Sequence, residues 1–197
     1  MHWVTRPSAS SAAVVGLREA LVRVTLDEDL ETAVPCVDWA LATGRLDRLG
    51  FERFLLALPV TARCIRDWVD PKSQSVLESV ARVRLLRRGW EVRTQVRVGD
   101  LQAIDLVVAD TIALETDGRA FHESSFETDR RKDLQITVEG RHCLRVSYSL
   151  VVTEWPLVEL AIERALLARG VPVRGSVVRR REPSGSRSSP RAITLDD

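Results

Sequence analysis

Apolar side chains recur at helical spacing through the first third of the chain and predict a series of helices. One face of the first helix carries Leu17, Ala20, Leu21 and Val24. Three further helices are predicted over residues 29–43, 45–57 and 62–69, and Pro35 marks a start or a kink in the first of these three. Asp70-Pro71 then forms a boundary, because a residue before proline avoids the helical conformation. Residues 1–70 are therefore predicted to be a helical N-terminal region.

Beyond this boundary the pattern mixes helical and strand periods. Helical spacing covers residues 75–88 and 125–139, and a last helix capped by Thr153 ends before Gly170. Strand-like alternation covers residues 90–98, 101–109, 111–117 and 143–148, with a hairpin turn at Gly99-Asp100 and another near Asp110. The order helix, three strands, helix, strand, helix predicts an α/β (α+β) domain over residues 71–170.

The last segment, residues 171–197, has a different composition. Gly, Ser, Pro and Arg dominate it, and Arg179-Arg180-Arg181 forms a basic cluster. Such a segment has too little apolar surface to offset the entropy of ordering. We predict a disordered basic tail whose removal leaves the melting temperature unchanged.

Composition and charge narrow the class of protein. The 197 residues are 45% hydrophobic and 29% charged, with a net charge of +1, so nucleic-acid affinity has to come from local clusters of charge. The sequence has no apolar run of membrane-spanning length and no signal-peptide pattern at its start. Its three cysteines, Cys36, Cys64 and Cys143, are far apart and lack zinc-ligand spacing. A cytoplasmic protein with buried free thiols is expected.

Candidate chemistry lies on two neighbouring strands. Alternation places Glu115 and Asp117 on one face of their strand, and a turn at Asp110 sets Asp105 opposite Glu115. Two carboxylates so opposed repel by roughly 3 kcal/mol at an effective dielectric constant near 20. A bound Mg²⁺ or Mn²⁺ would relieve this repulsion, because hard cations prefer carboxylate oxygens. The alternative is that all three acids lie on a solvated face of the sheet.

Three other residues extend this candidate site. Glu78 lies beside the apolar row of its helix, although Ser75 to Glu78 also matches a capping box. His122 follows the acidic strand and suits proton transfer, unless it is an ordinary surface histidine. Arg130 shares helical spacing with Phe126 and Leu134, which predicts that it faces inward toward an anion. The neighbouring charges at 129 and 131–133 fit a solvated face, and the segment 124–127 fits a capping box.

The order of these residues resembles a known family. The resemblance rests on Glu78-Ser79, Gln95, Asp105, Glu115-Thr116-Asp117-Gly118, Phe121-His122, Phe126, Asp129-Arg130-Arg131-Lys132-Asp133 and Leu144-Arg145-Val146. This set, spread from Ser75 to about Trp155, is similar to the small endonuclease-like proteins related to very-short-patch-repair endonucleases, within the PD-(D/E)XK superfamily. The helical N-terminal region also resembles the middle of longer actinobacterial members, which often carry an antitoxin-like winged-helix domain before it.

The resemblance implies a restriction-endonuclease-like four-stranded mixed sheet flanked by helices, a divalent metal and hydrolysis of DNA. It implies that Asp105 and Glu115 are metal ligands, with Glu78 as a supporting acid and His122 as a catalytic candidate. The superfamily lysine, two residues after the second acid, is replaced by Asp117, a third candidate ligand. The positive charge of that lysine is expected to come from His122, Arg130 or Lys132. Lys132 lies about 200° around the helix from Arg130 and is predicted to face away from the acids.

Two functions remain as hypotheses. The first is a metal-dependent DNA endonuclease or nickase that serves DNA repair or defence. The second is a non-catalytic DNA-binding or antitoxin-like regulator that retains the nuclease fold. DNA is the expected partner in both hypotheses, with a second copy of the chain or another protein as a further candidate partner. The sequence leaves open which DNA structure is recognised.

Overall fold

The computed structural model describes residues 15–99, 102–117 and 126–173. Its N-terminal region is helical, as predicted, and its elements are α1 (Leu17–Asp27), α2 (Leu30–Ala42), α3 (Arg48–Ala57) and a 3-10 helix, η1 (Val60–Asp67). Asp29 and Asp47 begin α2 and α3, since each side chain accepts a hydrogen bond from a backbone N–H of the first turn. Pro35 lies inside α2, where its ring is buried. Within the described ranges, no helix has the length and apolar character needed to cross a membrane.

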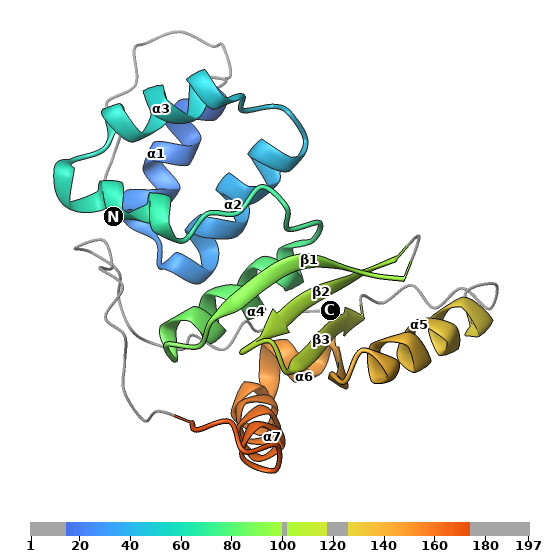
Figure 1. Cartoon of the computed structure of the whole chain (residues 1–197). Coiled ribbons are helices and arrows are strands. Elements are labelled where there is room, and N and C mark those ends of the chain that lie inside the picture. Colours follow the sequence, from blue (N-terminus) through green and yellow to red (C-terminus); the bar gives the residue numbers. More distant parts are fainter. Residues whose placement is uncertain (1–14, 100–101, 118–125, 174–197) are drawn as a thin grey trace, which may run out of the picture.

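The second region contains a sheet with helices on both faces (Figure 1). Its elements in chain order are α4 (Val76–Arg87), β1 (Val92–Val98), β2 (Gln102–Val108), β3 (Ile112–Asp117), α5 (Phe126–Val138), β4 (His142–Ser147), α6 (Tyr148–Thr153) and α7 (Trp155–Leu167). The strands lie in the order β1-β2-β3-β4; the first two pairings are antiparallel and the last is parallel. The predicted fold class, a four-stranded mixed sheet flanked by helices and preceded by a helical region, is confirmed.

One predicted helix start is wrong. Thr153 does not cap the last helix; it is the final residue of α6, and its hydroxyl donates to the carbonyl of Ser149. Ser147 caps α6 instead, by accepting from the backbone N–H of Leu150. Pro156 lies in the first turn of α7, where a missing N–H costs no helical hydrogen bond. The chain therefore makes two helices after β4 where one was predicted.

The register of β2 and β3 matches the one expected from a turn near Asp110. The pairs are Leu106 with Leu114, Val107 with Ala113, and Val108 with Ile112. Ala109 and Asp110 adopt positive φ values of 48° and 52° at the turn between the strands. Continuing the same pairing by one step sets Asp105 opposite Glu115. The turn thus determines which acids meet.

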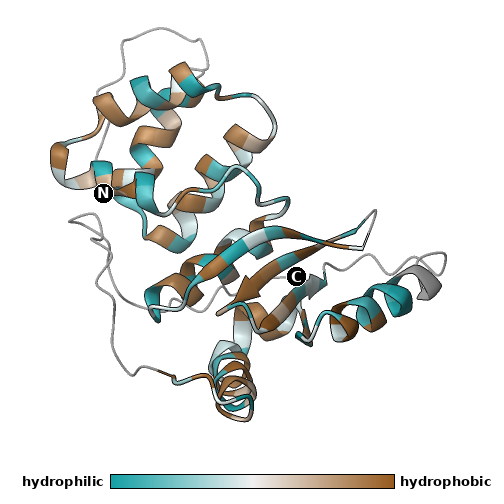
Figure 2. Ribbon diagram, viewed as in Figure 1, coloured by the Kyte–Doolittle hydropathy of each residue, from teal (hydrophilic) through white to brown (hydrophobic). Residues whose placement is uncertain are grey.

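Apolar packing divides into three clusters. One fills the helical region and includes Val83 and Leu86 of α4. A second lies between α4, α7 and one face of the sheet, and a third joins Ile136 of α5 to Val107 and Ala113 on the other face. Figure 2 shows apolar positions in the N-terminal helices as well as in the sheet and the helices around it, with hydrophilic positions between them. Because Val83 and Leu86 pack with the N-terminal helices, the helical region and the sheet region share α4.

An ion pair strengthens the same junction. Asp38 of α2 and Arg82 of α4 join through Oδ2 and Nη2 at 2.7 Å, and their side chains are only 1% and 4% exposed. Asp38 also accepts from the hydroxyl of Ser79 at 2.7 Å and the backbone N–H of Asp70 at 2.8 Å. Arg82 donates to the carbonyl of Trp68 at 2.5 Å. Both carboxylate oxygens of Asp38 and all three guanidinium nitrogens of Arg82 are thus hydrogen-bonded.

Candidate active site

A row of four polar side chains crosses the sheet at one level. Gln95 of β1 and Asp105 of β2 lie between the pairs Thr94–Leu106 and Val96–Ile104, and Glu115 of β3 pairs with Arg145 of β4. Gln95 has a φ of 52°, an unusual conformation for a residue with a side chain. We call Gln95, Asp105, Glu115 and Arg145 the polar row. Sequence alternation predicted two of its members, and the strand order supplies the others.

Asp105 is fixed by its neighbours on both sides. Its Oδ2 accepts from the backbone N–H of Thr116 at 2.9 Å and from the Thr116 hydroxyl at 3.1 Å. Its Oδ1 lies 3.5 Å from Nε2 of Gln95, at the limit of a hydrogen bond. One oxygen of this carboxylate is therefore committed to β3, and the other has only a weak donor.

Glu78 joins the polar row from α4. Its Oε2 accepts from Nε2 of Gln95 and from the backbone N–H of Gln74, each at 3.0 Å. Its own backbone N–H donates to the Ser75 hydroxyl at 3.1 Å, as the predicted capping box requires. The two interpretations of Glu78 are thus compatible: it belongs to the N-terminal cap of α4 and it contacts the polar row through Gln95.

Glu115 is buried, with 5% of the residue exposed. Its Oε2 lies 2.5 Å from Nζ of Lys132, on α5. Its Oε1 is buried and has no hydrogen-bond donor among the described residues. A buried carboxylate oxygen without a donor is costly, so this atom is open to a ligand that supplies positive charge.

The acids of the row influence one another's protonation. Burial raises the pKa of Glu115, and the negative charge of Asp105 raises it further, while Lys132 acts in the opposite direction. Burial also raises the pKa of Glu78, with a smaller contribution in the same direction from Asp105. Both carboxylates therefore hold a proton more readily in the folded chain than in water.

We expect the raised pKa values of Glu78 and Glu115 to lower the stability of the metal-free protein as the pH rises. A carboxyl whose folded pKa is raised stabilises the fold below its ordinary value of 4.5, and that contribution is lost as the pH climbs through the folded pKa. Glu78→Gln removes one such group and should make the free energy of unfolding fall less steeply above pH 4.5. Urea unfolding in EDTA at several pH values measures the slope, and equal slopes for the variant and wild type would contradict the assignment.

Arg145 closes the row on β4 by binding two further acids. Its Nη2 lies 2.8 Å from Oδ1 of Asp133 on α5, and its Nη1 lies 3.5 Å from Oδ1 of Asp117. Asp117, the third predicted ligand, is therefore oriented toward Arg145 at the end of β3.

Cys143, one of three free thiols, lies beside Asp133, and burial with nearby acids raises its pKa to about 12. This thiol is protonated and unreactive at neutral pH.

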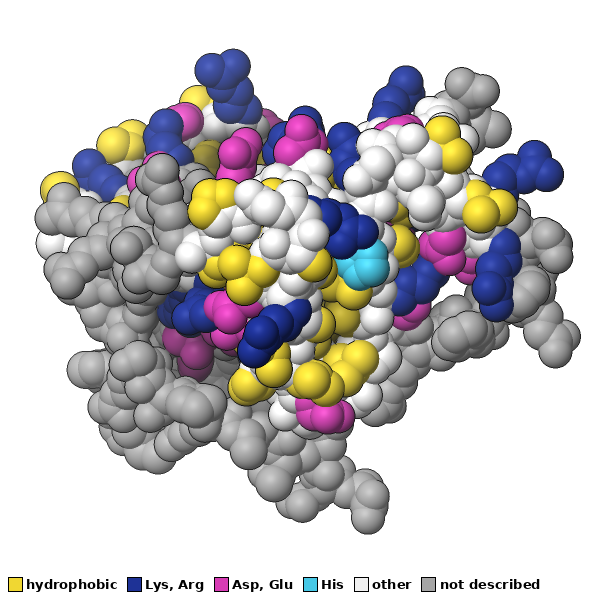
Figure 3. Space-filling view, turned by 60° about the horizontal axis from the view of Figure 1, so that its bottom comes forward, with side chains coloured by type: hydrophobic (Ala, Val, Ile, Leu, Met, Phe, Trp, Pro, Cys, Tyr) yellow, Lys and Arg dark blue, Asp and Glu magenta, His cyan; other side chains and the backbone are white. Residues whose placement is uncertain are grey.

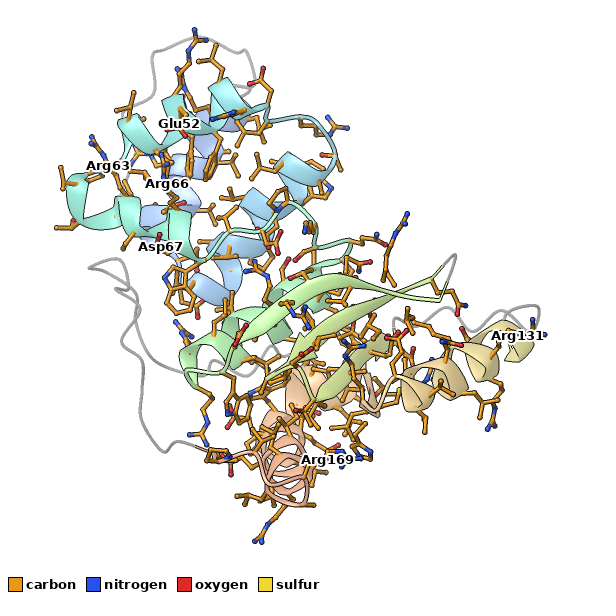
Figure 4. The ribbon with its side chains drawn as sticks, viewed as in Figure 1. Glu52, Arg63, Arg66, Asp67, Arg131 and Arg169 are labelled. Carbon is orange, nitrogen blue, oxygen red and sulfur yellow. The ribbon has the colours of Figure 1, made fainter. Side chains whose placement is uncertain are left out.

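The predicted orientation of α5 is wrong. Arg130 is exposed and Leu134 is 69% exposed, whereas Ile136 is fully buried and Lys132, one turn before it, reaches Glu115. The physical reason is that residues four apart share a helix face, so the burial of Ile136 brings Lys132 inward with it. Asp133 likewise belongs to the side that faces the sheet, and the expected solvated face is restricted to residues such as Arg131, which is exposed on α5 (Figure 4).

Some predicted features lie outside the described residues. His122 and the capping segment that begins at Ser124 are among them, so the roles expected of them stay predictions. The same holds for Asp100 in the first hairpin and for the basic tail beyond residue 173. Figure 3 shows a different surface, where apolar and basic side chains lie beside a histidine side chain.

Known proteins give no guide to this site. Comparisons with protein-family models, with curated proteins and with solved structures found no match.

Within the described ranges, no group of three or more His, Cys, Asp or Glu side chains is arranged to hold a metal ion. The polar row instead offers two neighbouring carboxylates, Asp105 and Glu115, one of which has an oxygen without a donor. Mg²⁺ is commonly held by one or two carboxylates, with water and substrate oxygens completing its shell, so the pair fits such an ion.

Proposed function

We propose that this chain is a divalent-cation-dependent phosphodiester hydrolase that acts on DNA as an endonuclease or nickase, similar to the PD-(D/E)XK nucleases. The observation that carries the proposal is the convergence of Glu78, Asp105 and Glu115, from one helix and two strands, around Gln95 and Lys132. Burying mutually repelling acids beside one ammonium group destabilises the ligand-free fold. Such costly arrangements are typical of sites that bind a ligand.

Asp105 and Glu115 would hold the cation, Mg²⁺ or Mn²⁺. When bound, such an ion polarises a phosphodiester and lowers the pKa of a water molecule. The buried Oε1 of Glu115 and the weakly bonded Oδ1 of Asp105 would be the ligand atoms for this cation. Asp117 is a weaker candidate ligand, because its carboxylate already contacts Arg145.

The other residues of the site orient these acids and supply positive charge. Gln95 binds both Glu78 and Asp105 through one amide nitrogen and so fixes the spacing of two carboxylates. Lys132 brings an ammonium group to Glu115 from α5. It would thus supply the positive charge of the superfamily lysine, whose position Asp117 occupies. Such a group stabilises negative charge that develops on a phosphate. Proton transfer by His122 remains part of the proposal.

Two exposed arginines on elements that carry the site are consistent with a polyanionic substrate. Arg97 is exposed on β1, two residues beyond Gln95, and Arg130 is exposed on α5. Arginine binds phosphate oxygens in a bidentate manner, so both side chains are candidates for contact with a DNA backbone.

A second candidate function is supported by the Lys132–Glu115 pair itself. An acid neutralised by a lysine has less need of a cation, and the described residues form no metal cluster of three or more ligands. A DNA-binding or antitoxin-like regulator that retains a nuclease fold would have these features. It would bind DNA without cleaving it.

Supercoiled plasmid separates the two functions. A hydrolase should convert it to the nicked or linear form with Mg²⁺ or Mn²⁺ and leave it intact in EDTA. A regulator should retard the same plasmid in a gel under both conditions and leave every strand whole. Retardation without any cation-dependent strand break, over a range of DNA structures that includes mismatched and branched duplexes, would contradict the proposed hydrolase.

A further inference from the structure

The two oxygens of the Glu115 carboxylate are in opposite situations. Oε2 is bound to the ammonium of Lys132 at 2.5 Å, while Oε1 is buried without a donor among the residues that the structure describes. The Lys132 side chain is 12% exposed, so water competes little for its ammonium. Among the described residues, Lys132 is thus the cation that forms an ion pair with Glu115.

We infer that Lys132 and a divalent cation compete for Glu115, so that binding of the cation moves the ammonium off this carboxylate. The inference rests on the proposed function, since it concerns the same cation site. An ammonium group and a divalent ion on one carboxylate lie a few ångströms apart and repel each other strongly at the low effective dielectric constant of a buried site. One of them has to move, and the cation is also attracted by Asp105.

Lys132 is the charge that can move. In the described part of the chain its ion pair is with Glu115 alone, and its four-carbon stem lets the ammonium swing without a change in the helix. Arg145, the other nearby cation, is held by Asp133 and Asp117 together and carries a rigid planar group. Displaced from Glu115, Lys132 stays beside the acids, where an ammonium can contact a phosphate oxygen.

Competition and static neutralisation predict different effects on Mn²⁺ binding when the ammonium is removed. If Lys132 competes with the cation, Lys132→Met should make Mn²⁺ bind more tightly, by about tenfold, which lies within the usual range of coupling between two ligands. The same variant should cleave DNA more slowly. If the pair only neutralises Glu115 and holds α5 in place, the variant should bind Mn²⁺ no more tightly than wild type.

The experiment is a calorimetric titration of the full chain with Mn²⁺, for wild type, Lys132→Met and the control Lys72→Met. Lys72 is an exposed lysine outside the polar row, and its variant should keep the wild-type Kd. A Kd for Lys132→Met that equals or exceeds that of wild type, with Mn²⁺ bound by both, overturns the inference and leaves the proposed function intact. Failure of every protein to bind Mn²⁺ overturns both.

A second measurement needs no variant, because Lys72 and Lys132 are the two lysines of the chain. Acetylation at a fixed pH, followed by mass spectrometry, reports how accessible each amine is. Addition of Mn²⁺ should speed acetylation of Lys132 several-fold relative to Lys72. An unchanged ratio of the two rates, under conditions where calorimetry shows the cation bound, overturns the inference even if Lys132→Met fails to fold.

Discussion

Replacement of Asp105 by asparagine is expected to remove cation-dependent DNA cleavage while leaving the fold intact. The side chain keeps its shape and an oxygen that can accept from Thr116, but it loses the charge that the cation requires. A metal ion contributes several kcal/mol of charge stabilisation, so we expect the cleavage rate to fall by about a hundredfold or more. Plasmid nicking under single-turnover conditions measures this rate.

The same variant should be at least as stable as wild type in EDTA. The charge of Asp105 raises the pKa of both Glu115 and Glu78, which means that it repels them in the folded chain. Its removal relieves this repulsion, and urea unfolding at pH 7.5 should show an equal or larger free energy of unfolding. An inactive variant that is also much less stable would indicate that Asp105 serves the fold, and an active one would exclude it from the site.

Asp38→Ala is expected to have the largest effect on stability of any single change discussed. It leaves the guanidinium of Arg82 buried without its carboxylate, and loss of one partner from a buried pair typically costs about 3–5 kcal/mol. The Ser79 hydroxyl and the backbone N–H of Asp70 lose their acceptor as well. Urea unfolding of the full chain measures the change in free energy.

Glu52→Ala provides the matched control. Glu52 and Arg66 also form an ion pair in the helical region, but their side chains are 45% and 54% exposed, and Figure 4 shows them on neighbouring helices. Exposed pairs contribute up to about 1 kcal/mol, so this variant should unfold almost as wild type does. Similar losses for Asp38→Ala and Glu52→Ala would show that the junction between α2 and α4 adds little.

This junction bears on how the site is positioned. Ser79, which donates to Asp38, directly follows Glu78 in α4, and Asp70 precedes the loop that leads to Gln74 and the cap. The helical region therefore holds the element that carries one acid of the site. Expression of residues 71–170 alone should yield an unstable fragment, because Arg82 and the apolar residues beside it would lose their partners.

Local pattern was enough to predict the antiparallel part of the sheet and the acids on it. Strand alternation and the turn near Asp110 determine the pairing of β2 with β3, and with it the approach of Asp105 to Glu115. Such a register needs no knowledge of distant segments, since a hairpin joins neighbours in sequence. The cap formed by Ser75 was equally local.

Contacts between distant segments could not be obtained in this way. Arg145 meets Glu115 through a parallel pairing across the α5 crossover, and Asp38 meets Arg82 between helices that are far apart in sequence. The prediction of the orientation of α5 was wrong for another reason. Leu134 and Ile136 are both apolar, so the pattern supports two different inward faces. Tertiary packing selects Ile136, and this choice decides that Lys132 rather than Arg130 enters the site.

Thermal melting with increasing Mn²⁺, for wild type and Asp105→Asn side by side, tests most directly whether Asp105 and Glu115 form a cation site. A ligand at a hundred times its Kd stabilises the folded state by about 2.7 kcal/mol, which corresponds to roughly 5–10 °C in Tm for a chain of this size. We predict a rise of this order for wild type at millimolar Mn²⁺ and little or no rise for Asp105→Asn. Equal melting temperatures with and without Mn²⁺ in the wild-type protein would contradict the account.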